Sequence, residues 1–273
     1  MPEACGAVLG KVLGWGLAAA AVYAALALLA HRSVFYPMKY PGGLWHLRDR
    51  LGAEDVWLTA SDGVRLHAWW VYRQDSRIAT LFLHGNAGNV THRLTALEAI
   101  PAAGSSLLLL DYRGYGRSEG SPSEQGVYRD AEAGYEWLRA RGYAPEQIVL
   151  HGESLGTAVA VELASRRPCR GLVLEAPFSS ARAVAGRVLP WLGPALISGF
   201  DSARRIRQVH APILILHGDR DDIIDIALGR ELFAAANEPK TFWEVPGAGH
   251  NDLPAAAGLA YEKRLAAFYA GGR

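Results

Sequence analysis

The sequence predicts an α/β protein with a doubly wound, mostly parallel, eight-stranded sheet. Strand-like and helical patterns alternate along most of the chain, as they do in parallel sheets covered by helices. The later strand-like runs are continuously apolar, which is typical of strands buried on both faces. The length after the first 48 residues, about 225 residues, suits one α/β domain with a sizeable core.

The expected strands fall into two groups. Val56–Leu58 and Leu66–Tyr72 form an antiparallel edge hairpin around the turn Ser61-Asp62-Gly63. The parallel strands follow at Thr80–Leu83, Leu107–Asp111, Ile148–Leu150, Leu172–Leu174, Ile213–Leu216 and Thr241–Val245.

Helical patterns separate these strands at His92–Ile100, Ser123–Arg141, Leu155–Ser165, Ile226–Ala236 and Leu259–Tyr269. Between Pro177 and Gln208 the chain is longer than a minimal crossover requires. We expect a small apolar cap insert at about 177–208, with a helix packed on the core as the alternative.

One motif predicts a nucleophile. Gly152-Glu153-Ser154-Leu155-Gly156 follows the apolar run Ile148-Val149-Leu150 and precedes a helical segment. A sharp strand-to-helix turn of this kind exposes the serine hydroxyl at the carboxyl edge of a sheet. Ser154 is therefore the candidate nucleophile, and the alternative is an ordinary turn with a solvent-facing serine.

A serine hydroxyl needs a base that is oriented by an acid. His250 lies in a glycine-rich loop just after a predicted strand, so we expect it to be the base. Several carboxylates compete for the role of the acid, and chemistry alone leaves the choice open among Asp219, Asp221, Asp222, Asp225 and Glu175.

Four further motifs carry a family resemblance. They are His84-Gly85-Asn86-Ala87-Gly88-Asn89, Asp111-Tyr112-Arg113-Gly114-Tyr115-Gly116 with Ser118-Glu119-Gly120, Phe200-Asp201-Ser202 and Gly247-Ala248-Gly249-His250-Asn251-Asp252. In this order they resemble the small membrane-anchored α/β-hydrolase-domain-containing proteins of the α/β-hydrolase superfamily. The likeness runs from about Phe35 to the C-terminus.

The resemblance implies the α/β-hydrolase fold and two site residues. It implies that Asp221 is the acid and that the backbone N–H of Asn86 is one oxyanion donor. The second donor is the N–H of Leu155, because it directly follows the nucleophile. Asp225 stands where such proteins often carry proline, which adds a competing carboxylate.

The N-terminus predicts a membrane anchor. Val12–Ala30 carries no charged residue and would span about 28 Å as a helix, close to the hydrocarbon thickness of a bilayer. We expect an anchor at 1–32, a connector at 33–48 and the hydrolase domain at 49–273, with a single-pass membrane location. A cleaved signal peptide and a buried helix are the alternatives, and too few basic residues flank the segment to orient it.

Other classes of function are disfavoured. The net charge is +1 with no basic stripe, which argues against nucleic acid as a partner. The chain has no glycine-rich phosphate-binding loop that ends in Lys-Ser/Thr, and we expect no cofactor. His84, His151 and His217 each end a strand and precede glycine. They suggest a metal site, but adjacent strands splay them apart, so we expect no metal and packing roles instead.

Together these features predict a serine hydrolase that cleaves carboxylic esters or thioesters through an acyl-enzyme. Its partners would be an acyl substrate and, through the N-terminal helix, membrane lipid. The insert supplies the expected substrate pocket, at Leu189, Trp191 and Leu192. The alternatives are a serine peptidase, since the same triad cleaves amides, and a hydrolase-like binding protein without activity.

Overall fold

The protein is described here by a computed structural model that covers residues 15, 17, 18, 20–30 and 33–271. Its main sheet has eight strands in the order β10-β9-β8-β7-β4-β6-β3-β2. The hairpin is β2 (Glu54–Thr59) with β3 (Arg65–Val71), and the other strands are β4 (Ala79–Leu83), β6 (Ser106–Leu110), β7 (Ile148–Glu153), β8 (Gly171–Glu175), β9 (Ile213–Gly218) and β10 (Lys240–Val245).

The pairing of the strands confirms the predicted fold class. β2 pairs with β3 and β3 with β6 in antiparallel fashion, and every other neighbouring pair is parallel. All eight predicted strands are present, with ends that differ by a few residues. The carboxyl ends of β4, β7, β8, β9 and β10 therefore meet at one edge of the sheet.

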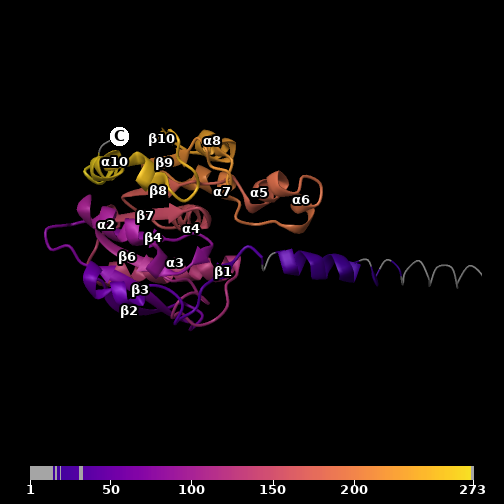
Figure 1. The fold of residues 1–273 in the computed structure, drawn as a ribbon, viewed down its shortest axis with the longest axis horizontal. Coiled ribbons are helices and arrows are strands. Elements are labelled where there is room, and N and C mark those ends of the chain that lie inside the picture. Colours follow the sequence, from indigo (N-terminus) through magenta and orange to yellow (C-terminus); the bar gives the residue numbers. More distant parts are fainter. Residues whose placement is uncertain (1–14, 16, 19, 31–32, 272–273) are drawn as a thin grey trace, which may run out of the picture.

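Helices cover both faces of the sheet (Figure 1). The core on one face includes side chains of α3 (Glu124–Ala140), α4 (Leu155–Ala164) and α8 (Ile226–Ala235). The core on the other face includes side chains of α2 (Leu94–Ala102), α9 (Leu253–Ala257) and α10 (Leu259–Tyr269). The five predicted helices correspond to α2, α3, α4, α8 and α10.

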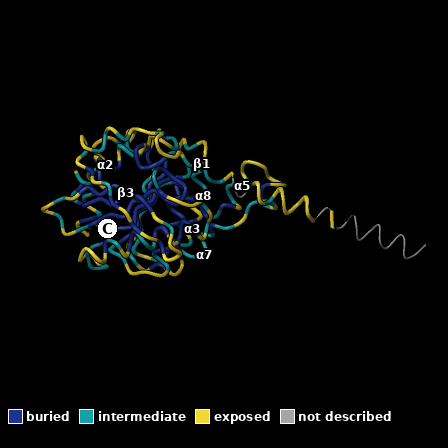
Figure 2. Tube along the Cα trace, turned by 90° about the horizontal axis from the view of Figure 1, so that it is seen from below, coloured by how far each residue is buried: buried dark blue, intermediate teal, exposed yellow. Residues whose placement is uncertain are grey.

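The apolar strands supply both cores because their side chains alternate between faces. On β6, Leu108 and Leu110 pack in one core while Leu107 and Leu109 pack in the other. All four are fully buried, as is the centre of the molecule in Figure 2. Burial on both faces explains why the sequence of these strands is apolar throughout rather than alternating.

Several short elements were not predicted. β1 (Tyr36–Pro37) pairs in parallel with β5 (Ala87–Gly88), outside the main sheet. The predicted cap region holds α5 (Ala181–Val188), α6 (Gly193–Leu196) and α7 (Ser202–Arg205). Figure 1 shows α5 and α6 beyond the body of the domain, near the N-terminal helical residues. The hydroxyl of Tyr23 donates to the Ala195 carbonyl over 2.5 Å, which joins these two parts.

The structure corrects one feature of the predicted fold. Residues 20–30 are helical and project away from the domain (Figure 1). Within the described ranges, no helix combines the length and apolar character that crossing a membrane requires. The predicted transmembrane helix at Val12–Ala30 is therefore not supported, and its residues 12–14, 16 and 19 lie outside the described part of the chain.

Candidate active site

The turn between β7 and α4 holds Ser154 at the carboxyl edge of the sheet. Ser154 has φ +51° and ψ −115°, a strained conformation for a residue other than glycine. The flanking glycines are required sterically: a Cβ on Gly152 would lie 2.4 Å from the Gly156 carbonyl oxygen. A Cβ on Gly156 would lie 1.8 Å from the Leu83 carbonyl oxygen. The predicted strand–turn–helix is present.

Ser154, His250 and Asp221 lie in one row. His250 Nε2 is 3.0 Å from Ser154 Oγ, and His250 Nδ1 is 2.8 Å from Asp221 Oδ2. The three residues follow β7, β10 and β9 in the chain, so the parallel sheet brings them to the same edge. A hydroxyl, an imidazole and a carboxylate at these distances have the arrangement of a nucleophile, a base and an orienting acid.

The Asp221 carboxylate is held as an anion. Its side chain is fully buried, and its Oδ1 accepts hydrogen bonds from the N–H groups of Ile223 and Ile224 at 3.0 and 2.8 Å. Burial raises the pKa of this carboxyl, but contacts with His217, His250 and the Ile224 N–H outweigh burial. The pKa of Asp221 therefore lies well below its usual range.

Three of the four competing carboxylates have other partners, and the fourth, Asp222, is exposed. Asp225 caps α8, because its Oδ1 accepts the Ala227 N–H at 2.8 Å. Glu175 Oε1 is 2.7 Å from His151 Nε2 and accepts the hydroxyl of Tyr261. Asp219 accepts the Gly247 N–H at 2.6 Å. Of these carboxylates, Asp221 is the one that the structure brings to His250.

Asn86 lies in the loop after β4, and Leu155 directly follows Ser154 as the first residue of α4. Over the described residues, neither of their backbone N–H groups donates to a backbone carbonyl. The Asn86 carbonyl is held from two directions: it accepts the Tyr115 hydroxyl at 2.7 Å and the Tyr36 N–H at 2.9 Å. Both N–H groups therefore remain available to a ligand at the serine.

The predicted connector also contacts this loop. The N–H of Met38 donates to the Gly88 carbonyl at 2.9 Å, and the Asn86 side-chain amide donates to the Val34 carbonyl at 3.2 Å. Contacts thus cross the boundary that the sequence predicts between residues 48 and 49. Sequence reasoning missed this pairing because a two-residue strand leaves no periodic pattern.

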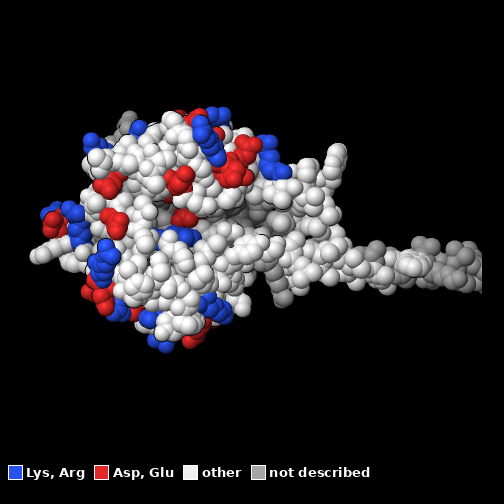
Figure 3. All heavy atoms as spheres, viewed as in Figure 1, with Lys and Arg blue, Asp and Glu red and all other residues white. Residues whose placement is uncertain are grey.

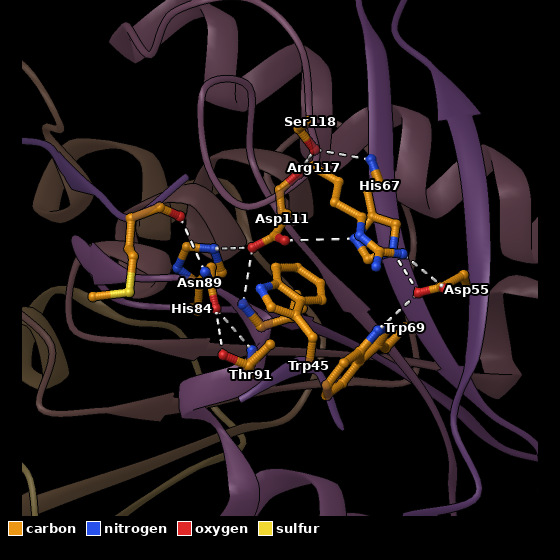
Figure 4. A network of polar contacts seen from close by, with 12 residues as sticks. Trp45, Asp55, His67, Trp69, His84, Asn89, Thr91, Asp111, Arg117 and Ser118 are labelled. Atoms are coloured by element: carbon orange, nitrogen blue, oxygen red, sulfur yellow. Dashed lines mark hydrogen bonds and ion pairs between the residues drawn. The ribbon is translucent and has the colours of Figure 1, made fainter. Parts of the chain in front are cut away.

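A buried network around Asp111 supports the same loop (Figure 4). Asp111 Oδ1 accepts the Val90 N–H at 2.9 Å, and the imidazoles of His67 and His84 lie 3.5 and 3.6 Å from the carboxylate. Burial raises the pKa of Asp111, but the two histidines outweigh it and lower the pKa. An aspartate at the end of an apolar strand was the sequence signal for this role.

The three histidines at strand ends do not converge on one point. His84 lies beside Asp111, and His151 pairs with Glu175. His217 Nε2 is 2.9 Å from the Ile224 carbonyl and 3.4 Å from Asp221. Each imidazole thus packs against its own partners beneath the site, in agreement with the packing role favoured by the sequence.

A cavity of about 630 Å³ opens in front of Ser154. This apolar cavity is lined by Ser154, His250 and apolar side chains from the cap region and from the loop after Asp221; they include Phe178, Val184, Val188, Leu189, Leu196, Ile197 and Ile224. Residues of the N-terminal helix and connector, Ala30, Ser33 and Val34, also line it. Its volume is in the range of small-molecule sites.

The three predicted pocket residues do not all line the apolar cavity. Leu189 lines the apolar cavity, as predicted. Trp191 and Leu192 are not among its walls, and the Trp191 side chain is 93% exposed. The prediction was wrong for these two: within the turn between α5 and α6 the backbone directs Leu189 into the cavity but Trp191 into solvent.

Comparison with known proteins places the chain in a family. A family model described as serine aminopeptidase S33 matches residues 74–200. A protein of Mycobacterium tuberculosis is 45% identical over 203 residues, which cover 72% of either chain. The α/β-hydrolase domain-containing protein WAV2 of Arabidopsis thaliana is 35% identical over 234 residues, covering 77% of this chain and 76% of that protein. The chain therefore belongs to the α/β-hydrolase superfamily.

Solved structures show the same fold. An esterase of Pyrococcus furiosus has a TM-score of 0.73 at 20% identity and covers 88% of this chain and 98% of its own. A monoacylglycerol lipase of Paleococcus ferrophilus has a TM-score of 0.61 at 21% identity, covering 76% of this chain and 98% of its own. These structures share the overall fold of this chain, in agreement with the α/β-hydrolase fold that the resemblance implies.

Proposed function

We propose that the protein is a serine hydrolase of carboxylic esters or thioesters. The observation that carries this proposal is the row Ser154, His250 and Asp221 facing an apolar cavity. The esterase and the lipase that share the fold support an ester substrate. Hydrolysis of p-nitrophenyl esters by the purified protein, sensitive to a fluorophosphonate, is the direct test.

In the proposed first step, Ser154 Oγ attacks the carbonyl carbon while His250 Nε2 takes the hydroxyl proton. The Nδ1–H of His250 donates to Asp221, which fixes the tautomer and stabilises the imidazolium. The oxyanion accepts the N–H groups of Leu155 and Asn86, which lack backbone partners. The bond to the leaving group breaks, and His250 returns its proton to the departing oxygen or sulfur.

In the second step, water attacks the acyl-enzyme and gives a proton to His250. The bond between the carbonyl carbon and Ser154 Oγ then breaks, and His250 reprotonates the serine. The cycle balances in protons and electrons without a cofactor. The helix N-terminus at Leu155 adds a favourable field for the negative charge in both steps.

The apolar cavity predicts a dependence on acyl-chain length. Each buried methylene contributes about 0.8 kcal/mol, so kcat/KM should rise along a series of p-nitrophenyl esters until the cavity is full. Val184→Trp should end the rise at a shorter chain, because Val184 lines the cavity. Trp191→Ala is the control and should leave the profile unchanged, since Trp191 is 93% exposed. If kcat/KM of the wild type does not depend on chain length, or if only Trp191→Ala changes this dependence, the cavity does not bind the acyl chain.

Tyr115 provides a test of the oxyanion loop. Tyr115→Phe removes the hydroxyl that holds the Asn86 carbonyl, and we expect kcat to fall by about tenfold with little change in KM, in line with one lost hydrogen bond. Tyr135→Phe is the matched control, because Tyr135 is also buried and donates to a backbone carbonyl, that of Pro168, far from the serine. Equal kinetic losses in the two variants would argue against a positioning role.

A peptidase is the second candidate, because the matching family model is described as serine aminopeptidase. The same nucleophile, base and acid cleave amides when the site binds a peptide. Parallel assays with a p-nitrophenyl ester and with amino-acid p-nitroanilides separate the two. Greater kcat/KM on the anilides would favour the peptidase.

We propose a membrane location for the N-terminal segment. The support is its uncharged stretch at Val12–Ala30 and the exposure of its apolar side chains, for example 77% at Trp15. On the face shown in Figure 3, charged side chains gather on the domain, and none lies on those residues of the projecting helix that the structure describes. We expect deletion of residues 1–32 to move the protein from the membrane to the soluble fraction with its fluorophosphonate labelling intact. Release of the full-length protein by high salt alone would contradict burial in lipid.

A further inference from the structure

We propose that a second cavity beside His250 binds the alcohol portion of the substrate, and that this portion is a small neutral alcohol with several hydroxyl groups. The inference rests on the proposed ester hydrolysis and adds the substrate class. In this reading the acyl chain occupies the apolar cavity and the hydroxylated alcohol occupies the second one.

The second cavity has a volume of about 180 Å³. It shares four wall residues with the apolar cavity: Arg93, Glu153, His250 and Asn251. Ser154 lines only the apolar cavity. His250 thus stands between the two spaces, with its Nε2 3.0 Å from Ser154 Oγ.

This position matches the route of the leaving group. When the ester bond breaks, the acyl group stays on Ser154 Oγ and the alkoxy oxygen takes its proton from His250 Nε2. The leaving alcohol must therefore lie against His250 while the acyl chain lies against the serine. A cavity that has His250 in its wall but not Ser154 is placed to take the alcohol. Its small volume restricts the alcohol to a few heavy atoms, since whole-ligand pockets measure about 300–1,000 Å³.

The walls of this cavity select neutral hydroxyl groups. Arg93 Nη2 donates to the Ala87 carbonyl at 2.8 Å, and Arg93 Nε lies 3.0 Å from Glu153 Oε2 in a geometry that does not form a hydrogen bond. The two side chains are 14% and 26% exposed. A hydroxyl both donates and accepts, so it satisfies the carboxylate and the guanidinium together.

Other leaving groups fit less well. Glu153, Glu175, Arg93, His92 and His250 are the titratable groups around the cavity, apart from the buried Tyr261. A phosphate or carboxylate would meet two glutamates. An ammonium group would meet Arg93 beside Glu153, while Glu175 is already engaged by His151 and Tyr261. An apolar alcohol would desolvate the charged pair of Arg93 and Glu153 without replacing its hydrogen bonds.

The test compares three octanoyl esters: 1-octanoylglycerol, methyl octanoate and 1-octanoylglycerol 3-phosphate. We expect the wild type to prefer the glyceryl ester over the methyl ester by at least about tenfold in kcat/KM, as hydrogen bonds to charged groups allow. Arg93→Met and Glu153→Gln should each bring this ratio close to one. Because both esters use the same acyl site, the ratio cancels any general loss of activity.

Arg187→Met is the matched control and should keep the wild-type ratio, because Arg187 pairs with Asp225 and is not in the wall of this cavity. A second measurement follows acyl transfer from p-nitrophenyl octanoate to added glycerol or to 1-propanol. Preferential transfer to glycerol, lost in Glu153→Gln, would support the same site independently of the first step.

The outcomes are distinguishable. If the esters are turned over in a Ser154-dependent way, two results would overturn the alcohol site and leave the hydrolase proposal intact. One is a glyceryl-to-methyl ratio of kcat/KM near one in the wild type, and the other is a ratio that neither substitution changes. A preference for the phosphate-bearing ester would overturn it in favour of an anionic alcohol. Absence of Ser154-dependent turnover of every ester would overturn the proposed function and this inference with it.

Discussion

Replacing Ser154 by alanine should lower kcat for ester hydrolysis by several orders of magnitude and abolish fluorophosphonate labelling. The loss is large because serine, histidine and aspartate act as a unit, and what remains comes from the oxyanion donors and substrate binding alone. A loss on the order of 10⁴ to 10⁶ is typical of such sites. The measurement is steady-state turnover of a p-nitrophenyl ester by wild type and Ser154→Ala.

The fold should survive this change. Ser154 is 9% exposed and its backbone N–H donates to the Glu175 carbonyl at 2.9 Å, a bond that alanine retains. Thermal unfolding of the two proteins is therefore the control. Ser154→Ala with near-wild-type esterase activity would refute the proposed mechanism. If Ser154→Ala fails to fold, Ser154→Cys takes its place, because the thiol keeps a nucleophile at this position and fluorophosphonates label a thiol poorly.

Asp221→Asn should cost on the order of 10⁴ in kcat. An asparagine at this position stabilises the wrong tautomer of His250, because its amide presents a donor or a weaker acceptor to Nδ1. The pKa of Asp221 lies well below its usual range, so the carboxylate is ionised at any neutral assay pH. The substitution therefore removes a full charge throughout, and a change of pH near neutrality should not rescue it.

Asp225→Asn is the matched control for the acid. Asparagine also caps helices, so the hydrogen bond to the Ala227 N–H is preserved, and the ion pair with Arg187 is largely exposed to solvent. We expect activity within about threefold of wild type, as for a surface change of this kind. A large loss at Asp225 or at Glu175→Gln, with little loss at Asp221→Asn, would move the acid to another residue.

The parts that the sequence predicts well are those in which local pattern and tertiary structure agree. Strands buried on two faces leave apolar runs such as Leu107–Leu110, and a sharp turn leaves small residues around Ser154. The row of Ser154, Asp221 and His250 depends on residues far apart in the chain. Ser154 and His250 were nevertheless predicted, because parallel strands all end at one edge, whereas Asp221 was implied by the family resemblance alone.

The parts that escaped prediction depend on long-range contacts without a local pattern. Trp191 and Leu189 are both apolar and two positions apart, yet only Leu189 faces the apolar cavity. Composition cannot distinguish them, since the difference lies in how the backbone of the turn between α5 and α6 directs each side chain. The choice of Asp221 over its neighbours likewise follows from backbone donors at Ile223 and Ile224, which position the carboxylate.

The short ladder between β1 and β5 has a consequence for local stability. A displacement of the N-terminal helix would act first on two hydrogen bonds, from the Tyr36 N–H to Asn86 and from the Met38 N–H to Gly88, at the surface of the domain. The neighbouring strand β4 is hydrogen-bonded to β6 on one side and to β7 on the other, so its hydrogen bonds would stay intact. This region opens at lower free energy than the sheet does, so amide exchange at Tyr36 and Met38 should be faster than in β4. Exchange at these two positions would then report on how the N-terminal segment is held, in the same loop that carries Asn86.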